Sequence, residues 1–352
     1  DEVARIMGTH KLLEVSNLSV EFETYGGVVK AVRGVDFSVD AGEVLAIVGE
    51  SGCGKSVTVQ SIMGIIPMPP GKITGGSAKL KGEEILGLQA QAANQFRGKE
   101  IGMIFQDPMT SLNLTMTIGA QIAETLKVHR GLSTQQASEI ASELLIRTRI
   151  PEAQKRLNQY PFEFSGGMLQ RAMIAQSLAC SPSLLIADEP TTALDVTIQA
   201  QILDLLKELQ SRDGMAIILI THDLAVVART AQNVCVMYAG QIVEQGSVDD
   251  IFYKSAHPYT LGLKLAMPSN VSQQNKKLEP IPGSPPDLFS PPSGCGYAAR
   301  CPHAMRICHK ENPPLFSDPR EPLHAARCWL QAPGAPKTQG LYQPNLIASH
   351  GA

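Results

Sequence analysis

The sequence predicts an α/β fold in which helices cover both faces of a mostly parallel sheet. Short apolar runs of the kind found in buried parallel strands recur along the chain. Segments with helical periodicity separate them, among them 57–66 and 197–212, where the apolar residues fall on one face. Such alternation is typical of a parallel sheet in an α/β domain. The runs are 44–48, 101–105, 184–187, 216–220 and 234–237.

Two further regions extend this core. Residues 12–22 and 28–39 alternate apolar and polar side chains around a Gly26–Gly27 turn, which predicts an antiparallel β subdomain. Residues 71–82, rich in Gly, Lys and Ser, favour a surface hairpin. Residues 112–149 carry helical periodicity with few breakers and predict a helical insertion.

Composition and charge limit the possible classes. The chain has 352 residues, 43% hydrophobic and 18% charged, with a net charge of −3, so we expect two domains and no nucleic-acid partner. No apolar run approaches the roughly 18 to 20 residues that span a bilayer. Residues 1–10 lack the pattern of a secretory signal. We therefore expect a cytoplasmic location, with other chains supplying any membrane-spanning part.

A glycine-rich segment follows the first apolar run. Gly49–Ser56 fits the phosphate-loop pattern G-x-x-x-x-G-K-[ST], with a buried strand before it and a helix after it. The glycines allow backbone N–H groups to surround phosphate, and the helix start adds its positive dipole end. Lys55 would neutralise the β and γ phosphates, and the Ser56 hydroxyl would bind Mg²⁺.

A second nucleotide element ends the run 184–187. The strand delivers Asp188 to a metal ion, directly or through water, and Glu189 beside it. Glu189 can then act as a general base on the attacking water. Two acids after a strand are usually a solvated strand end, but here they follow a complete phosphate loop.

The segment that decides the class is 164–171, FSGGMLQR. Its Ser165-Gly166-Gly167 precedes a helix and forms a second anion-binding helix start. Two such starts in one chain make sense if two chains enclose nucleotide between them. In this respect residues 12–266 resemble the ATP-binding-cassette (ABC) transporter ATPases. The resemblance implies a phosphate-loop cassette with a RecA-like parallel-sheet core, an antiparallel β subdomain and a helical subdomain at about 107–180.

The resemblance also assigns roles to further residues. Tyr25 lies where an aromatic ring stacks on adenine, and Gln106 resembles the glutamine that senses Mg²⁺ and water. Asp195 resembles the D-loop aspartate, and His222 the switch histidine. The expected catalytic residues are Glu189, His222 and Lys55, and the expected Mg²⁺ ligands are Ser56, Gln106 and Asp188. The expected nucleotide contacts are Tyr25, Gly49, Ser51, Gly52, Cys53, Gly54, Lys55, Ser56, Val57, Gln106, Ser165, Gly166, Gly167 and Asp195.

Three positions in two segments depart from the family pattern. The usual signature is L-S-G-G-Q, whereas this chain has Phe164 and Met168 at its ends. Leu114 stands where a proline is usual after the glutamine loop. In the signature, the groups expected to touch phosphate, Ser165 and the glycine amides, are retained.

The C-terminal part narrows the resemblance. AHPYT at 256–260, IPGSPP at 281–286 and RCPHAM at 300–305 resemble the extension of oligopeptide and dipeptide permease ATPases, most closely the D-type subunit. We expect a nucleotide-binding domain at 11–266, an irregular Cys-rich extension at 267–330, and a flexible tail at 331–352. The resemblance implies a related second ATPase as heterodimer partner, two transmembrane permease subunits and an extracytoplasmic peptide-binding protein, at the cytoplasmic face of the inner membrane.

Four of the seven cysteines crowd this extension. Cys295, Cys301, Cys308 and Cys328 have the spacing C-x5-C-x6-C-x19-C, without the C-x2-C pairs of zinc ribbons. Four thiolates with Pro302 after the second favour a [4Fe–4S] cluster, as some relatives of the family carry. A zinc site and unligated cysteines remain the alternatives.

The function expected is ATP hydrolysis that powers uptake of oligopeptides or dipeptides. One alternative keeps this role but changes the cargo to nickel, glutathione, murein peptides or opines. Another is a soluble cassette protein of DNA repair or translation, but such proteins generally carry two cassettes or a basic arm, which this chain lacks.

Overall fold

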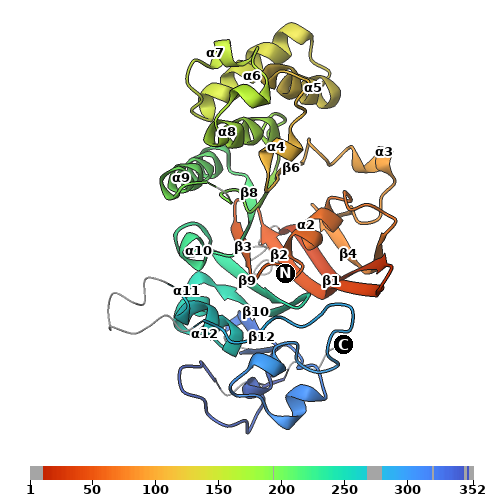
Figure 1. The fold of residues 1–352 in the computed structure, drawn as a ribbon, viewed down its shortest axis with the longest axis vertical. Helices are drawn as coiled ribbons and strands as arrows, with labels where there is room; N and C mark the ends of the chain where they lie inside the picture. Colours follow the sequence, from red (N-terminus) through yellow and green to blue (C-terminus); the bar gives the residue numbers. More distant parts are fainter. Residues whose placement is uncertain (1–10, 193, 268–279, 319–320, 345–346, 349–352) are drawn as a thin grey trace, which may run out of the picture. The chain divides into compact units, whose positions relative to one another are not determined.

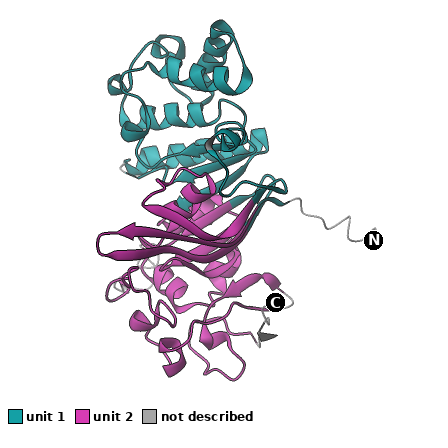
Figure 2. Cartoon of the chain, turned by 90° about the vertical axis from the view of Figure 1, so that its right-hand side faces the viewer, with its two compact units in different colours: residues 1–13, 38–44, 79–220 teal, residues 14–37, 45–78, 221–352 magenta. Residues whose placement is uncertain are grey.

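The computed structural model describes residues 11–192, 194–267, 280–318, 321–344 and 347–348 (Figure 1). The chain divides into two compact units, each made of segments far apart in sequence (Figure 2). Unit 1 comprises 1–13, 38–44 and 79–220, and unit 2 comprises 14–37, 45–78 and 221–352. None of the described helices combines the length and apolar character that crossing a bilayer needs.

Unit 1 contains the predicted parallel strands β6 (Ile101–Ile104), β7 (Leu184–Asp188) and β8 (Ala216–Thr221). β7 pairs with β6 on one side and with β8 on the other, in parallel register. All residues of the three strands are buried, as their continuous apolar runs predict. Parallel strands bring their carboxyl ends to one edge, and Asp188 ends β7 there.

The helical region of unit 1 is confirmed but is more divided than the periodicity of 112–149 predicts. Local signals set its boundaries: Thr117 and Ser133 cap two helices, and Gly131 ends the first of them in a left-handed conformation. The helices are α3 (Ala90–Ala93), α4 (Pro108–Ser111), α5 (Ile118–Arg130), α6 (Thr134–Arg147), α7 (Ala153–Arg156), η1 (Pro161–Glu163), α8 (Gly166–Ser177) and α9 (Val196–Asp213).

The predicted antiparallel subdomain is present, and its strands are ordered β2-β1-β4-β5. β1 (Lys11–Thr24) and β2 (Gly27–Asp40) are the two alternating segments. The hairpin expected at 71–82 extends further than predicted: 71–80 form one strand, β4 (Gly71–Leu80), which pairs in antiparallel register with the short β5 (Glu83–Glu84) that follows. The glycines allow β4 to pass close to its neighbour, since a Cβ at Gly76 would lie 2.6 Å from the Leu18 Cα.

A second group of strands in unit 2 carries the phosphate loop. β3 (Val44–Val48) pairs in parallel with β9 (Asn233–Tyr238), and β9 continues in antiparallel register to β10 (Gln241–Ser247). β10 then pairs with β12 (Glu321–Ala326), β12 with β11 (Phe316–Asp318), and β11 with β13 (Ile347–Ala348). The helices are α2 (Lys55–Ile62), α10 (Leu224–Thr230), α11 (Val248–Tyr253) and α12 (Pro258–Leu265).

The extension folds onto the core of unit 2 rather than forming a core of its own. Tyr297 packs its ring against Tyr238 of β9 and Tyr259 of α12, with ring centroids 5.3 and 5.4 Å away. Cys295 and Cys301 lie against the same buried cluster. The helices in the described part of the extension are short: η3 (Ala298–Arg300), η4 (Arg306–His309) and η5 (Trp329–Gln331).

The expectation of a flexible tail is wrong for its described part, 331–344. The Tyr342 N–H donates to the Ser255 carbonyl (2.9 Å), and the buried Gln331 amide donates to the Ala256 and Tyr342 carbonyls. The Gln343 side chain donates to the Leu330 carbonyl over 2.7 Å. Composition suggested mobility because Pro, Gly and Gln are common in loops, but here the glutamine amides supply hydrogen bonds that fix the segment.

Candidate nucleotide site and cysteine cavity

The phosphate loop of unit 2 has the backbone that its glycines predict. Gly49 and Gly54 have φ angles of 156° and 103°, and neither position has room for a side chain. A Cβ would lie 2.2 Å from the Met237 carbonyl oxygen at Gly49, and 2.4 Å from the Ala31 carbonyl oxygen at Gly54. The loop therefore requires glycine at both positions.

Lys55 begins α2 and its side chain folds back over this loop. It is 4% exposed, and Nζ donates to the carbonyls of Gly49 (2.9 Å) and Glu50 (3.0 Å). Gly54 is the N-cap of α2 and contributes no side-chain hydrogen bond. The N–H groups of the first helical turn and the Lys55 ammonium thus converge where an anion would be stabilised.

The carboxyl end of β7 in unit 1 holds the predicted acids. Asp188 is buried at 3% exposure, and Glu189 has a positive φ of 45°. The Glu189 carboxylate accepts from Gln106 Nε2 (3.2 Å) and from Thr192 Oγ1 (2.9 Å). The structure therefore joins the predicted sensor glutamine to the predicted base by a direct hydrogen bond.

The signature segment forms the start of α8 in the same unit. Ser165 is the N-cap of this helix and is exposed, and its hydroxyl accepts from the Met168 N–H (3.4 Å). Asp195 caps α9 in a similar way, accepting from the Ile198 N–H over 2.9 Å. Gly167 packs against Ile198 closely enough that a Cβ would lie 3.1 Å from its side chain. The two predicted loops therefore lie together, with Ser165 and Asp195 both facing solvent.

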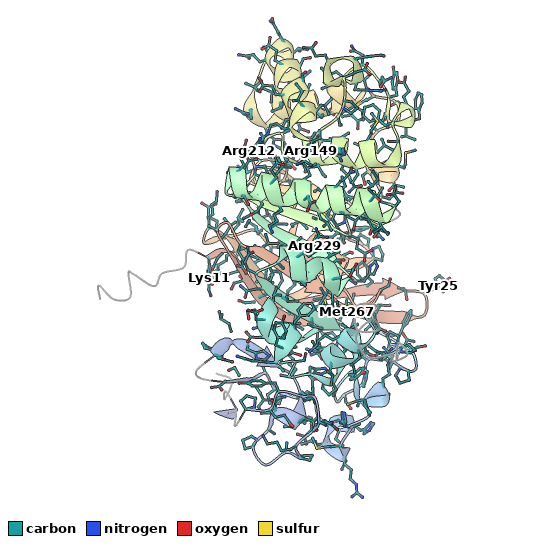
Figure 3. The ribbon with its side chains drawn as sticks, turned by 90° about the vertical axis from the view of Figure 1, so that its left-hand side faces the viewer. Lys11, Tyr25, Arg149, Arg212, Arg229 and Met267 are labelled. Atoms are coloured by element: carbon teal, nitrogen blue, oxygen red, sulfur yellow. The ribbon has the colours of Figure 1, made fainter. Side chains whose placement is uncertain are left out.

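The remaining predicted residues belong to unit 2. His222 is exposed directly after β8, and Asp223 beside it caps α10. Tyr25 is fully exposed at the turn between β1 and β2, where its side chain stands away from the ribbon (Figure 3). The predicted nucleotide residues are thus shared between the two units: the phosphate loop, Tyr25 and His222 lie in unit 2, and the others in unit 1.

Three of the residues that hold the phosphate loop were not identified from the sequence. The Glu50 N–H donates to the Tyr259 hydroxyl (2.9 Å), and the Glu50 carboxylate accepts from both terminal nitrogens of Arg300 (2.6 and 3.0 Å). This pairing raises the pKa of Arg300 above its ordinary value. The Tyr238 hydroxyl also accepts from Arg300, over 3.2 Å. The sequence signal was the position of Arg300 directly before Cys301, which pointed to the extension but not to Glu50.

The four cysteines of the extension line one small cavity, which we call the cysteine cavity. Cys308 and Cys328 are buried and the other two are half-buried, and the cavity walls also include Tyr297, Trp329 and His257. Burial raises the pKa of the Cys301 thiol to about 11, and burial also raises the pKa of Cys295 and Cys328. Thiols in such a place stay protonated at neutral pH unless a metal holds the thiolates.

His257 is a buried residue that also lines the cysteine cavity. It is 1% exposed, its Nδ1 accepts from the Tyr259 N–H (3.0 Å), and its Nε2 has no hydrogen-bond partner among the residues that the structure describes. Burial lowers the pKa of His257 to about 3, so the ring is neutral and carries its proton on Nε2. A buried N–H without an acceptor is costly, and a sulfur bearing negative charge is an acceptor of the right chemistry.

The spacing of the thiols bears on which metal fits. Zinc with Zn–S bonds of about 2.3 Å would bring tetrahedral sulfurs to about 3.8 Å from one another. Among the described residues, the group of three potential ligands within 4.8 Å is Asp250, Glu321 and His324, which includes no cysteine. The cavity measures about 10 Å³, room for a single water. The four thiols around the cavity are a donor set that suits a thiolate-bound metal group.

Comparison with known proteins identifies the family. Residues 32–192 match the ABC transporter model, and residues 243–308 match the C-terminal region of oligopeptide/dipeptide transporters. The chain is 55% identical to the oligopeptide transport ATP-binding protein OppD of Bacillus subtilis, over 94% of this chain and 91% of that protein. It is 52% identical to the dipeptide transport ATP-binding protein DppD of Lactococcus lactis, over 94% of each chain.

Solved structures match the cassette part. The ATP-binding cassette MJ0796, determined as a dimer bound to ADP and Pi, aligns with a TM-score of 0.60 at 26% identity, over 67% of this chain and 98% of that one. The cassette cbiO1 of Clostridium perfringens aligns with a TM-score of 0.58 at 28% identity, over 69% and 91%. These likenesses establish the cassette fold, and the relatives exclude the alternative of a soluble DNA-repair or translation protein. The chain belongs to the family of ATP-binding proteins of oligopeptide and dipeptide ABC transporters.

Proposed function

We propose that this chain hydrolyses ATP to power the uptake of oligopeptides or dipeptides across the cytoplasmic membrane. The observation that carries the proposal is the phosphate loop, in which Lys55 and the start of α2 present an anion site behind a buried strand. The identity to oligopeptide and dipeptide transport ATP-binding proteins over more than nine-tenths of the chain supports the peptide cargo.

Each predicted site residue has a separate role in ATP binding or hydrolysis. Lys55 and the α2 N–H groups bind the β and γ phosphates, and Tyr25 stacks on adenine. Ser56, Gln106 and Asp188 are the residues that would hold Mg²⁺, which neutralises phosphate charge when bound. Glu189 accepts a proton from the attacking water, and His222 orients the γ phosphate. The Gln106–Glu189 hydrogen bond supports a role of Gln106 in reporting the state of the base.

The second half of each site comes from another chain. Ser165, Gly166, Gly167 and Asp195 are exposed or half-exposed at the ends of α8 and α9, as they would be if they served nucleotide bound to a partner. We infer a heterodimer with a related ATPase, attached to two permease subunits and served by an extracytoplasmic peptide-binding protein. The complex would place this chain at the cytoplasmic face of the membrane.

The test is transport-coupled hydrolysis. The full chain, purified from membranes with its attached subunits and reconstituted in vesicles, should show ATPase activity that its binding protein stimulates when loaded with a peptide of two to five residues. Stimulation by nickel, glutathione or an opine instead would assign a different cargo. ATPase activity without any attached permease would contradict the transport role.

The domain limits follow from the same proposal. Residues 11–266 form the nucleotide-binding domain, with the helical subdomain at about 107–180, and residues 267–330 form the extension. Proteolysis under native conditions tests these limits. Fragments that keep the phosphate loop and the four cysteines on separate pieces would agree with these limits.

The cysteine cavity is proposed to hold a [4Fe–4S] cluster bound by Cys295, Cys301, Cys308 and Cys328. The four thiols that line one cavity and the buried His257 Nε2, which lacks an acceptor among the described residues, support a bound group that carries negative charge. Its main effect would be structural, because the extension has little apolar core of its own. Protein purified without oxygen should contain four iron and four acid-labile sulfide per chain. Stoichiometric zinc without iron would refute the cluster.

A further inference from the structure

Two residues from the C-terminal part of unit 2, Tyr259 and Arg300, form hydrogen bonds with the phosphate loop. Glu50 is the loop residue concerned. Its N–H donates to the Tyr259 hydroxyl (2.9 Å), and its carboxylate accepts two hydrogen bonds from Arg300 (2.6 and 3.0 Å). Its carbonyl accepts from Lys55 (3.0 Å). One residue therefore connects the phosphate-binding lysine to the extension.

The Arg300 donors that do not bond to Glu50 bond to two carbonyls of the extension and to one residue of β9. Its Nε donates to the Pro282 carbonyl (2.8 Å), and its terminal nitrogens also donate to the Ile281 carbonyl (3.3 Å) and the Tyr238 hydroxyl (3.2 Å). All five guanidinium N–H groups are thus used, and the side chain is 5% exposed. A bidentate pair of this kind fixes orientation as well as distance.

Arg300 also lies inside the cysteine segment. It ends η3, between Cys295 and Cys301, and directly precedes Cys301. The Cys295 N–H donates to the Cys308 carbonyl over 2.8 Å, which closes this segment on itself. A change in how the four thiols are held therefore acts on the backbone that carries Arg300.

The loop itself gains from such support. Gly49, Gly52 and Gly54 all have positive φ, and glycine has the widest backbone freedom of any residue. When a ligand binds only the ordered form of a loop, its apparent association constant is the intrinsic constant multiplied by the fraction of protein in which the loop is ordered. Holding Glu50 in place raises the fraction ready for phosphate.

We propose that Arg300 is a positioning residue that orders the phosphate loop through Glu50, and that it conveys the state of the cysteine cavity to nucleotide affinity. The proposal rests on the proposed function in one respect, that the loop binds Mg·ATP. It assigns to the extension an effect on the first step of the ATP cycle.

The first test measures binding of the Mg complex of AMP-PNP, a non-hydrolysable ATP analogue, to the full chain by calorimetry. Arg300→Gln should weaken binding about tenfold, equivalent to about 1.4 kcal/mol. Glu50→Gln should weaken it to a similar extent, and the double variant should be no worse than either single variant, because the pair acts as a unit. Arg306→Gln, an exposed arginine of the same extension, is the matched control and should bind as wild type does.

Hydrogen exchange gives a readout independent of nucleotide. Without ligand, the amides of 49–56 should exchange faster in both single variants and not in Arg306→Gln. If Arg300→Gln fails to fold, Glu50→Gln alone tests the ordering role, because it leaves the hydrogen bonds from Arg300 to the Pro282 and Ile281 carbonyls intact. Unchanged or tighter binding by a folded Glu50→Gln chain would overturn the ordering role.

The link to the cysteine cavity is tested by Cys301→Ala. This variant should also weaken AMP-PNP binding, and adding Arg300→Gln should produce little further loss. Full additivity of the two changes, or wild-type affinity in Cys301→Ala, would overturn the link. If the wild-type chain itself bound no AMP-PNP, the proposed function would fail instead, and the two failures are therefore distinct.

Discussion

Replacing Glu189 by glutamine separates nucleotide binding from hydrolysis. The amide has the shape of the carboxylate. Thr192 Oγ1 and Gln106 Nε2 both donate to Glu189 Oε2, so an amide oxygen at that position keeps both hydrogen bonds. The substitution therefore preserves the carboxyl end of β7 and removes only the negative charge and the basic oxygen.

The expected loss of turnover follows from the chemistry of a general base. Such a group contributes about 10²- to 10⁴-fold to the rate, so the barrier should rise by about 3 to 5 kcal/mol. Affinity for Mg·ATP should change by less than threefold, because the proposed phosphate contacts, Lys55 and the start of α2, are left unchanged. The two parameters should thus respond very differently to one substitution.

Phosphate release from the purified complex, measured with saturating Mg·ATP, gives the turnover, and binding of a fluorescent ATP analogue gives the affinity. Glu143→Gln, an exposed glutamate of α6 in the same unit, is the control for losing one negative charge and should retain wild-type turnover. A Glu189→Gln complex that hydrolyses ATP within threefold of wild type would refute the assignment of Glu189 as the base.

Three other substitutions test separate parts of the structure. Gly54→Ala should abolish binding of ATP analogues in calorimetry, because its Cβ would lie 2.4 Å from the Ala31 carbonyl oxygen at a φ of 103°. Ser165→Ala should lower stability by only about 0.5 to 2 kcal/mol in urea unfolding, as for other caps, yet remove most ATPase activity of the assembled complex. Glu244→Gln should destabilise the chain by about 2 to 3 kcal/mol, also by urea unfolding, because this fully buried carboxylate accepts two backbone N–H groups and faces His324.

The phosphate loop could be predicted from sequence because its physics is local. Glycines that require positive φ, a lysine and a helix start lie within eight consecutive residues, Gly49–Ser56. The buried strands were equally predictable, since continuous apolar runs such as β7 have few other stable environments. The helix ends within 112–149 were not predicted, because the apolar periodicity continues across them. A single residue such as Gly131, in a left-handed conformation, is enough to end a helix there.

Long-range polar pairing was the part that sequence could not reveal. Glu50 and Arg300 are 250 positions apart, and each is an ordinary residue in its own neighbourhood. The glutamines of the tail pose the same difficulty, because Gln331 has the composition of a loop residue and becomes buried only through its partners. A sequence pattern predicts the environment of a polar residue from the residues next to it in the chain. The positions of these side chains are instead determined by hydrogen-bond partners from distant segments.

The segment that contains Cys295, Arg300 and Cys301 would serve nucleotide binding through its contact with Glu50. Glu50 is the first variable residue of a loop whose glycines are needed for close backbone approach, so the loop cannot be stiffened by replacing them. Stiffness must come from outside, and Arg300 supplies it from a segment with only short helices. Such a segment must itself be held in one conformation before it can hold Glu50 in place. A metal group bound by the four thiols around the cavity would hold it in that way. Order in the phosphate loop would then depend on a chain of contacts that begins at the thiols.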